Sequence, residues 1–222
     1  MKYAWLQARR WYQARHTFED PLRACMQARL PATGTPFEQI EFVAMDIETT
    51  GLDPVTADMV SVGWVVVRQG RVMLDTARSL LVRPSRGGGD SASVHGLTDT
   101  VVNSGTDWGI ALDNVVEALT GRVLLVHHAG LDKALLDRLC QRRYATPLFV
   151  PVVDTMALEL QWRQRHHHLH HDASLRLADL RQSYGLPRYA AHDALVDAIA
   201  TGELLAAMVA HRNSTTLGEL LS

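Results

Sequence analysis

The sequence predicts an α/β domain built on a mixed sheet, and three features of the chain carry this prediction. Strand candidates follow one another at residues 41–47, 59–70 and 71–83, and "RQGR" between the last two is typical of a hairpin turn. Beyond residue 107, helical patterns alternate with short strands. The stretch "GRVLLVHH" contains a short continuous apolar run, which favours a strand buried on both faces.

The remaining elements are expected from apolar spacing and turn composition. Residues 107–120 repeat apolar side chains at helical intervals, and "RPSRGGGDSAS" before them predicts a loop. Further elements are expected as helices at about 130–143, 155–164, 174–184 and 193–211, and as a strand at "VPVVDT".

The N-terminal region differs in pattern from the rest of the chain. Residues 1 to about 30 predict one or two amphipathic helices broken near Pro21, and "LPATGTP" has the composition of a linker. We therefore expect an N-terminal helical extension and linker at 1–38, the main domain at 39–213 and a C-terminal tail at 214–222.

The composition is that of a globular protein. Hydrophobic residues make up 47% and charged residues 21%, a balance that supports a substantial core. The net charge of -2 gives no global attraction to nucleic acid, although a local groove can still be basic. No apolar run approaches the roughly 20 residues of a membrane span, and "MKYAWLQARRWYQARH" lacks a signal-peptide core. With only Cys25 and Cys140 present, we expect a reducing, cytoplasmic setting.

The stretch "MDIETTGL" at residues 45–52 ends a strand with two acids. Asp46 and Glu48 alternate, so they share one face of the strand about 7 Å apart. Two such charges repel unless a cation lies between them. Asp132 follows the buried strand where a helix begins, a position that the helix dipole alone also favours for an acid.

A third acidic segment, "YAAHDALVDAIATGELL", begins the last long helix. Asp193 and Asp197 are four residues apart and share a helical face, so spacing does not decide which points inward. His192 is equally compatible with a core or capping histidine.

These three segments together resemble a known family. "DIETTGL", "HHAGLD" and "HDALVD" resemble, in order, the three motifs of the DEDDh, or DnaQ-like, 3′–5′ exonucleases, which include the epsilon proofreading subunit of bacterial DNA polymerase. The resemblance covers roughly residues 42–211, and "VHGLT" at 94–98 is similar to a loop of the family. It implies an RNase H-like fold, with a mixed five-stranded sheet flanked by helices.

The resemblance also implies a catalytic set. Asp46, Glu48, Asp132 and Asp197 would be the metal ligands and His192 the general base, which leaves Asp193 a supporting or surface role. Hard oxygen ligands without a cysteine suit two Mg²⁺ ions, for which Mn²⁺ can substitute. Such a pair activates the attacking water and stabilises the leaving oxygen.

Further residues would contact the substrate. By resemblance, the backbone at Thr49 and Thr50 meets the terminal nucleotide, Gly51 permits close approach, and Leu52 wedges against the last base. Ordinary packing is the alternative for Leu52. The other implied substrate contacts are His95 and His128. His128 stands where the family usually has asparagine, which puts its contact in doubt.

The resulting prediction is a metal-dependent 3′–5′ exonuclease. It would shorten single-stranded nucleic acid, with DNA favoured over RNA, and release nucleoside 5′-monophosphates. The alternatives are a proofreading subunit that acts only within a DNA polymerase complex and an RNA-directed exoribonuclease. An inactive binding module is disfavoured because all five catalytic positions are intact.

The expected partners are 3′ ends of single-stranded DNA or RNA and not a membrane. About 41 residues precede the first motif and little follows the last helix, which favours a stand-alone nuclease. A DNA polymerase or DNA repair partner and a homodimer are also compatible with the sequence. The low-complexity run "HHHLHH" at 166–171 is interpreted as an exposed insertion and not as a metal site.

Overall fold

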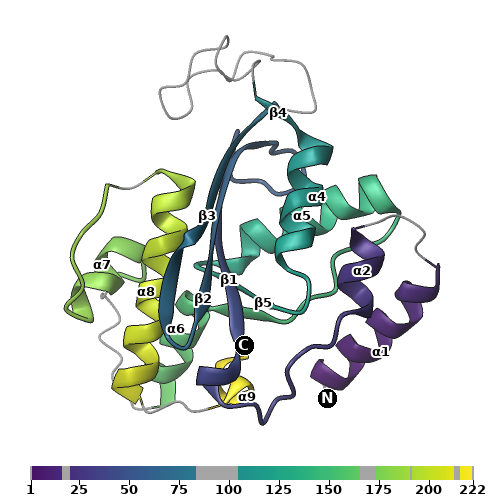
Figure 1. Cartoon of the computed structure of the whole chain (residues 1–222). Coiled ribbons are helices and arrows are strands. Elements are labelled where there is room, and N and C mark those ends of the chain that lie inside the picture. The colour runs from purple at the N-terminus through teal and green to yellow at the C-terminus, as the bar shows by residue number, and fades with distance from the viewer. Residues whose placement is uncertain are drawn as a thin grey trace.

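The computed structural model describes residues 2–16, 21–83, 105–165, 174–190, 192–212 and 216–221. Its centre is a mixed sheet with the strand order β4-β3-β2-β1-β5-β6 (Figure 1). The strands are β1 (Glu41–Thr49), β2 (Met59–Arg68), β3 (Arg71–Arg83), β4 (Thr106–Asp107), β5 (Val123–Val126) and β6 (Val152–Asp154). The first three strands pair antiparallel, whereas β5 and β6 continue the sheet parallel to β1.

The predicted α/β class and mixed sheet are confirmed, with one strand more than the five expected. The additional strand, β4, has two residues and pairs parallel with the end of β3. A strand of this length has no periodicity that a sequence could reveal. Its addition leaves the RNase H-like arrangement of the other five strands unchanged.

Helices cover both faces of the sheet. Figure 1 shows α4 and α5 on one side and α6, α7 and α8 on the other. These helices are α4 (Trp108–Ala118), α5 (Ala129–Tyr144), α6 (Thr155–Arg165), α7 (Leu177–Ser183) and α8 (Ala194–Arg212). Their bounds agree with the predicted helices to within a few residues.

Strand β1 supplies side chains to both layers. Val43 and Met45 belong to the core cluster beneath α4 and α5, while Phe42 and Ala44 belong to the cluster beneath α8. Because successive side chains point to opposite faces, Asp46 and Glu48 continue the row of Phe42 and Ala44. The two acids are therefore directed toward the face that α8 covers.

The N-terminal helices α1 (Lys2–His16) and α2 (Leu22–Gln27) pack on the side of α4 and α5 (Figure 1). The predicted break near Pro21 is confirmed. Arg10 is 2% exposed and donates hydrogen bonds to the carbonyls of Phe149, Cys25 and Ala28 at 2.6, 2.5 and 3.1 Å. This side chain fastens α1 to α2 and to the segment before β6.

The segment before β1, which contains the short helix η1 (Phe37–Gln39), meets the C-terminal helix α9 (Leu217–Leu220). Backbone N–H groups of Leu217 and Gly218 donate to the carbonyls of Thr35 and Thr33 at 3.0 and 2.7 Å. Leu217 and Leu220 are buried in the core beneath α8. The division into 1–38, 39–213 and 214–222 stays a proposal. Helix α9 packs against residues on both sides of the proposed boundary between residues 38 and 39.

Helix α8 lies very close to the sheet. By length and composition alone it could cross a membrane, but its apolar residues pack against β1, β2 and β3. A Cβ added to Gly63 of β2 would lie 2.2 Å from the backbone nitrogen of Leu195, and one added to Gly202 would lie 2.8 Å from Val67. Glycine at both positions permits the helix to contact the strands at backbone distance.

We predict that Gly63→Ala destabilises the protein. The new methyl group would overlap the backbone of α8, and overpacking of this kind costs about 1–3 kcal/mol. Equilibrium unfolding in urea measures the loss. Gly34→Ala is the matched control, because an added Cβ there has no neighbour within 4 Å. Equal unfolding midpoints for the two variants would contradict the predicted clash.

Candidate functional site

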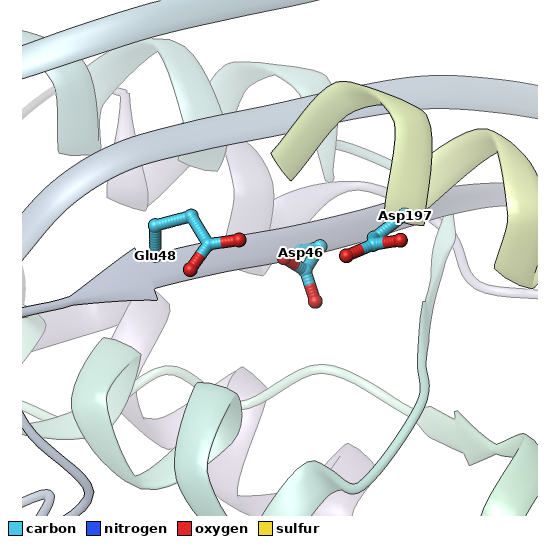
Figure 2. Close-up of side chains that lie close together, drawn as sticks. All are labelled: Asp46, Glu48 and Asp197. Atoms are coloured by element: carbon cyan, nitrogen blue, oxygen red, sulfur yellow. The ribbon is translucent and has the colours of Figure 1, made fainter. Parts of the chain in front are cut away.

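Three acids from β1 and α8 converge on one point beside the sheet. Oxygens of Asp46, Glu48 and Asp197 lie within 4.8 Å of one another. Figure 2 shows the two β1 carboxylates and the α8 carboxylate directed into the same space. In the part of the chain that the structure describes, this is the only such group of histidine, cysteine and acidic ligand atoms.

Asp132 approaches this group from α5. It lies in the first turn of α5, is 5% exposed, and accepts a hydrogen bond from the backbone N–H of Ile47. Its charge interacts with that of Glu48. The carboxyl ends of β1 and β5 thus bring the second-motif acid to the first-motif acids.

The structure separates the roles of the two acids that begin α8. The Asp193 carboxylate accepts hydrogen bonds from the N–H groups of Leu195 and Val196 at 3.0 and 3.1 Å. Asp193 therefore caps the helix, while Asp197, one turn later, joins the acidic group.

Crowding of these carboxylates shifts their protonation equilibria. Burial raises the pKa of Asp46 well above its usual range, and the charges of Asp132, Asp197 and Glu48 act in the same direction. Burial, together with Asp154 and Glu48, raises the pKa of Asp132 to about 8. Burial also raises the pKa of Asp197, against the opposing hydrogen bond from His192. Full ionisation of the group therefore requires a compensating positive charge.

The donor set fits hard divalent cations. Carboxylate oxygens are the ligands that Mg²⁺ and Mn²⁺ prefer, and the half-buried positions of the three acids distinguish this group from acids scattered on a surface. Asp46, Glu48 and Asp197 are the residues that would hold such an ion, with Asp132 beside them.

His192 is tied to the third acid. It has φ 69°, an unusual value for a residue other than glycine, and its backbone N–H donates to Asp197 Oδ2 at 3.1 Å. His192 and Asp197 line one cavity of about 1050 Å³, together with Leu52 and His128. The predicted base and the predicted ligand thus face a common space.

The predicted substrate contacts around Thr49 build a compact turn after β1. Thr49 Oγ1 donates to the carbonyl of Gly51 at 2.6 Å, and the backbone N–H of Thr50 donates to the carbonyl of Asp58 at 3.0 Å. A Cβ on Gly51 would meet no atom of the described residues within 4 Å, which leaves room beside this backbone. Leu52 is 88% exposed, which rules out ordinary core packing for its side chain.

Three predictions fall on residues outside the described ranges. These are the predicted loop at 84–93, the substrate contact of His95 and the exposed insertion at 166–171.

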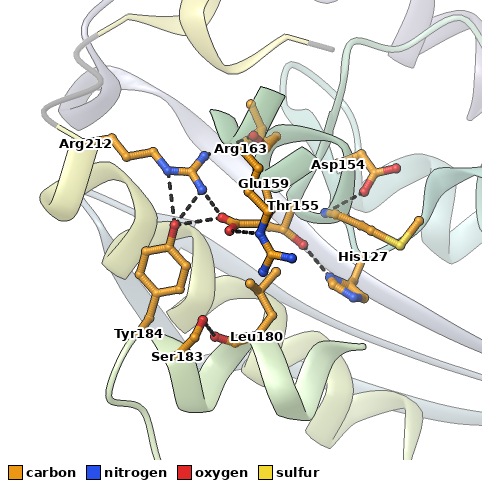
Figure 3. A network of polar contacts seen from close by, with 11 residues as sticks. His127, Asp154, Thr155, Glu159, Arg163, Leu180, Ser183, Tyr184 and Arg212 are labelled. Atoms are coloured by element: carbon orange, nitrogen blue, oxygen red, sulfur yellow. Dashed lines mark hydrogen bonds and ion pairs between the residues drawn. The ribbon is translucent and has the colours of Figure 1, made fainter. Parts of the chain in front are cut away.

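The two histidines of the second motif have different surroundings. The imidazole of His127 contacts Thr155 Oγ1 at 2.8 Å through Nδ1 (Figure 3). Its Nε2 contacts the carbonyl of Leu175 at 2.9 Å. Burial lowers the pKa of His127. Its ring therefore joins β5 to α6 and to the segment before α7. His128 instead is exposed, has φ 77° and borders the cavity.

Sequence reasoning missed Asp154 at the end of β6. Its carboxylate accepts hydrogen bonds from the backbone N–H groups of His128, Ala129 and Met156 at 3.0, 2.8 and 2.9 Å. Figure 3 draws the last of these bonds. Asp154 therefore fixes the beginning of α5, the helix that carries Asp132. The available signal was an acid directly before a helical pattern, which is typical of an N-cap.

A second cavity, of about 1110 Å³, lies between α1 and the start of β1. Its acidic lining residue, Glu41, is paired with Arg68 and Arg122 at 2.6 and 2.8 Å. Because this cavity lacks a convergent acidic group, the chemistry favours the cavity beside Asp197.

The chain is similar to a known protein family and to several named proteins. A family model described as Exonuclease, of the RNase T group, matches residues 43–205. The DNA polymerase III subunit epsilon of Treponema pallidum is 30% identical over 182 residues, which cover 78% of this chain and 79% of that protein. An epsilon-like protein of Rhodobacter capsulatus is 31% identical over 198 residues, which cover 85% of this chain but 27% of that protein. The chain spans 12% of the PolC-type polymerase of Thermotoga petrophila, at 25% identity.

Solved structures show the same fold at low sequence identity. Exonuclease X in complex with 5′ overhanging duplex DNA has a TM-score of 0.57 at 22% identity, covering 81% of this chain and 97% of that one. Escherichia coli Exonuclease I in complex with a dT13 oligonucleotide has a TM-score of 0.64 at 17% identity, covering 79% and 42%.

The family model covers most of the sequence, and the Treponema relative matches most of both chains. The protein therefore belongs to the DEDDh, or DnaQ-like, family of exonucleases.

Proposed function

We propose that the protein removes nucleotides one at a time from the 3′ end of single-stranded nucleic acid, preferably DNA, and releases nucleoside 5′-monophosphates. The observation that carries the proposal is the convergence of Asp46, Glu48 and Asp197 within 4.8 Å, beside a cavity that His192 also lines. The named complexes of related folds, dT13 for Exonuclease I and duplex DNA with a 5′ overhang for Exonuclease X, support a DNA substrate.

Two divalent cations, Mg²⁺ or Mn²⁺, would supply Lewis-acid activation of water and neutralise charge on the phosphodiester. Asp46, Glu48 and Asp197 would hold one cation, and Asp46 together with Asp132 the other. Burial disfavours the ionised forms of these acids, and the positive charge of the cations would favour them.

The protein's own groups have defined roles in hydrolysis. His192 takes a proton from the attacking water while the water oxygen forms a bond to the phosphorus of the last linkage. The bond from this phosphorus to the 3′ oxygen of the penultimate sugar breaks, and the 3′ oxygen takes a proton from solvent. The turn at Thr49, Thr50 and Gly51 receives the terminal nucleotide, and Leu52 bears on its base. His95 and His128 are the further contacts proposed for the substrate.

A second candidate function is proofreading within a DNA polymerase complex. The names of the Treponema and Rhodobacter relatives favour it. Purified protein without a polymerase distinguishes the two, since a stand-alone nuclease is fully active alone. If the purified protein is inactive alone, the proposed partner is a DNA polymerase or a DNA repair protein. The proposed cellular location is the cytoplasm.

A strand labelled at its 5′ end tests the proposed polarity. We expect a ladder that shortens from the 3′ end, while a 3′-phosphate delays it and a circular strand survives. Equal cleavage of the circle would indicate an endonuclease instead. The same assay with matched RNA, in Mg²⁺ and in Mn²⁺, decides between a deoxyribonuclease and an exoribonuclease.

We predict that Asp197→Asn impairs metal binding, whereas His192→Ala impairs proton transfer and leaves metal binding intact. Both variants should lose activity, His192→Ala by about 100-fold or more. Mn²⁺ should raise the unfolding temperature of the wild type and of His192→Ala, but hardly that of Asp197→Asn, because a ligand stabilises only a fold that binds it. Equal Mn²⁺ stabilisation of Asp197→Asn and the wild type would remove Asp197 from the metal site.

We also predict a pH-dependent stability difference between Asp132→Asn and the wild type without divalent cations. The pKa of Asp132 is about 8 in the folded protein against an ordinary value of 3.8, so only the folded chain keeps this proton between those values. The contribution of Asp132 to stability is therefore present below about pH 4 and declines as pH rises toward 8.

Asp132→Asn removes this titration, so its stability relative to the wild type should increase steadily from pH 4 to pH 8. Urea unfolding across this range measures the difference. A difference that does not change with pH would contradict the burial and charge crowding assigned to Asp132. Addition of Mg²⁺ should reduce the difference, because a bound cation favours the ionised carboxylate.

A further inference from the structure

The cavity beside the acids contains an aromatic side chain that the proposed mechanism leaves without a role. Tyr189 lies between α7 and α8, three residues before His192. Its side chain borders the same cavity as Leu52, His192 and Asp197. Tyr189 is 39% exposed, so a substantial part of the ring is available to a molecule in this cavity.

The ring is held at one face and at its hydroxyl group. The guanidinium of Arg181 lies over the ring, 4.4 Å from its centroid. The Tyr189 hydroxyl donates to Glu203 Oε1 at 3.0 Å, and Arg181 Nη2 donates to Glu203 Oε2 at 2.8 Å. Because Glu203 belongs to α8, these contacts fix the ring to the helix that carries Asp197.

Arg181 itself is firmly anchored. It is 1% exposed and donates to the carbonyls of Ala200 and Pro187 at 2.7 and 3.0 Å. Among the described residues, its buried Nε has no hydrogen-bond partner, so the guanidinium is held through its two terminal nitrogens. The guanidinium of Arg181 therefore covers one face of the Tyr189 ring. The solvent-exposed area of the ring lies on the parts that Arg181 does not cover.

We propose that Tyr189 is a stacking platform for a nucleobase in one of the two nucleotides that flank the scissile linkage. The inference rests on the proposed 3′-exonuclease function and identifies a residue that grips the substrate. A ring that is immobilised but left exposed binds a base with little ordering cost, and every base offers a flat face to it. The exposed Leu52, from the β1–β2 connection, lies on the wall of the same cavity.

The test pairs Tyr189→Ala with strands that lack one base. On an intact strand the variant should raise KM about 10-fold, within the usual range for loss of a base–aromatic stack, and change kcat by less than about twofold. On strands with an abasic residue at the last or the penultimate position, the effect of Tyr189→Ala should nearly disappear for one position only. That position identifies the stacked base.

Two variants control for loss of structure and of aromatic surface in general. Tyr189→Phe keeps the ring and should retain a KM close to that of the wild type. Tyr12→Ala removes an exposed aromatic ring of α1, outside this cavity, and should leave KM unchanged. If Tyr189→Ala lowers the unfolding temperature, Tyr189→Leu preserves apolar volume without an aromatic face and should still raise KM.

A lower kcat with equal losses on intact and abasic strands would overturn the platform and show that Tyr189 only positions the loop before His192. Binding of a fluorescent oligonucleotide without divalent cations gives a readout that does not require turnover. Tyr189→Ala should weaken this binding about 10-fold, and unchanged affinity would also overturn the inference. A wild type that binds through Tyr189 but never shortens a strand would instead contradict the proposed function.

Discussion

The backbone contact between α8 and the sheet is the constraint on which the site depends. Gly63 is the β2 partner of Asp46 in the antiparallel register, and the first turn of α8 rests directly on it. Asp197 can reach Asp46 only because no side chain separates this helix from the strands. Gly63 has no functional group of its own. Its lack of a side chain nevertheless sets the distance between Asp46 and Asp197, which come from distant parts of the sequence.

Apolar packing supplies the free energy that holds these acids together. Val43 and Met45 on one face of β1, and Phe42 and Ala44 on the other, are almost completely buried, and they fix the strand that carries Asp46 and Glu48. Backbone hydrogen bonds to Asp154 likewise fix the start of α5. The like charges of the acids repel one another. The acids stay close together because apolar packing and the hydrogen bonds to Asp154 fix the strand and the helix that carry them.

The sequence alone predicts the parts of this arrangement that follow from periodicity. Alternation along β1 places Asp46 and Glu48 on one face, and helical spacing gives α4, α5 and α8 to within a few residues. Periodicity cannot choose between Asp193 and Asp197, because that choice depends on where the helix begins relative to the strand. It also does not reveal Asp154 or Tyr189, whose roles arise from neighbours distant in sequence. The two-residue strand β4 is too short to have a pattern.

His128 and His192 occupy similar backbone positions in different motifs. Each precedes a helix that carries one of the acids, and each has a left-handed φ that glycine adopts more readily. Non-glycine residues held in such conformations cost on the order of 1–3 kcal/mol each. The molecule therefore stores conformational strain at two points on the rim of one cavity. An engineer who seeks greater heat resistance would find glycine attractive at both points, and would remove an imidazole from the cavity each time.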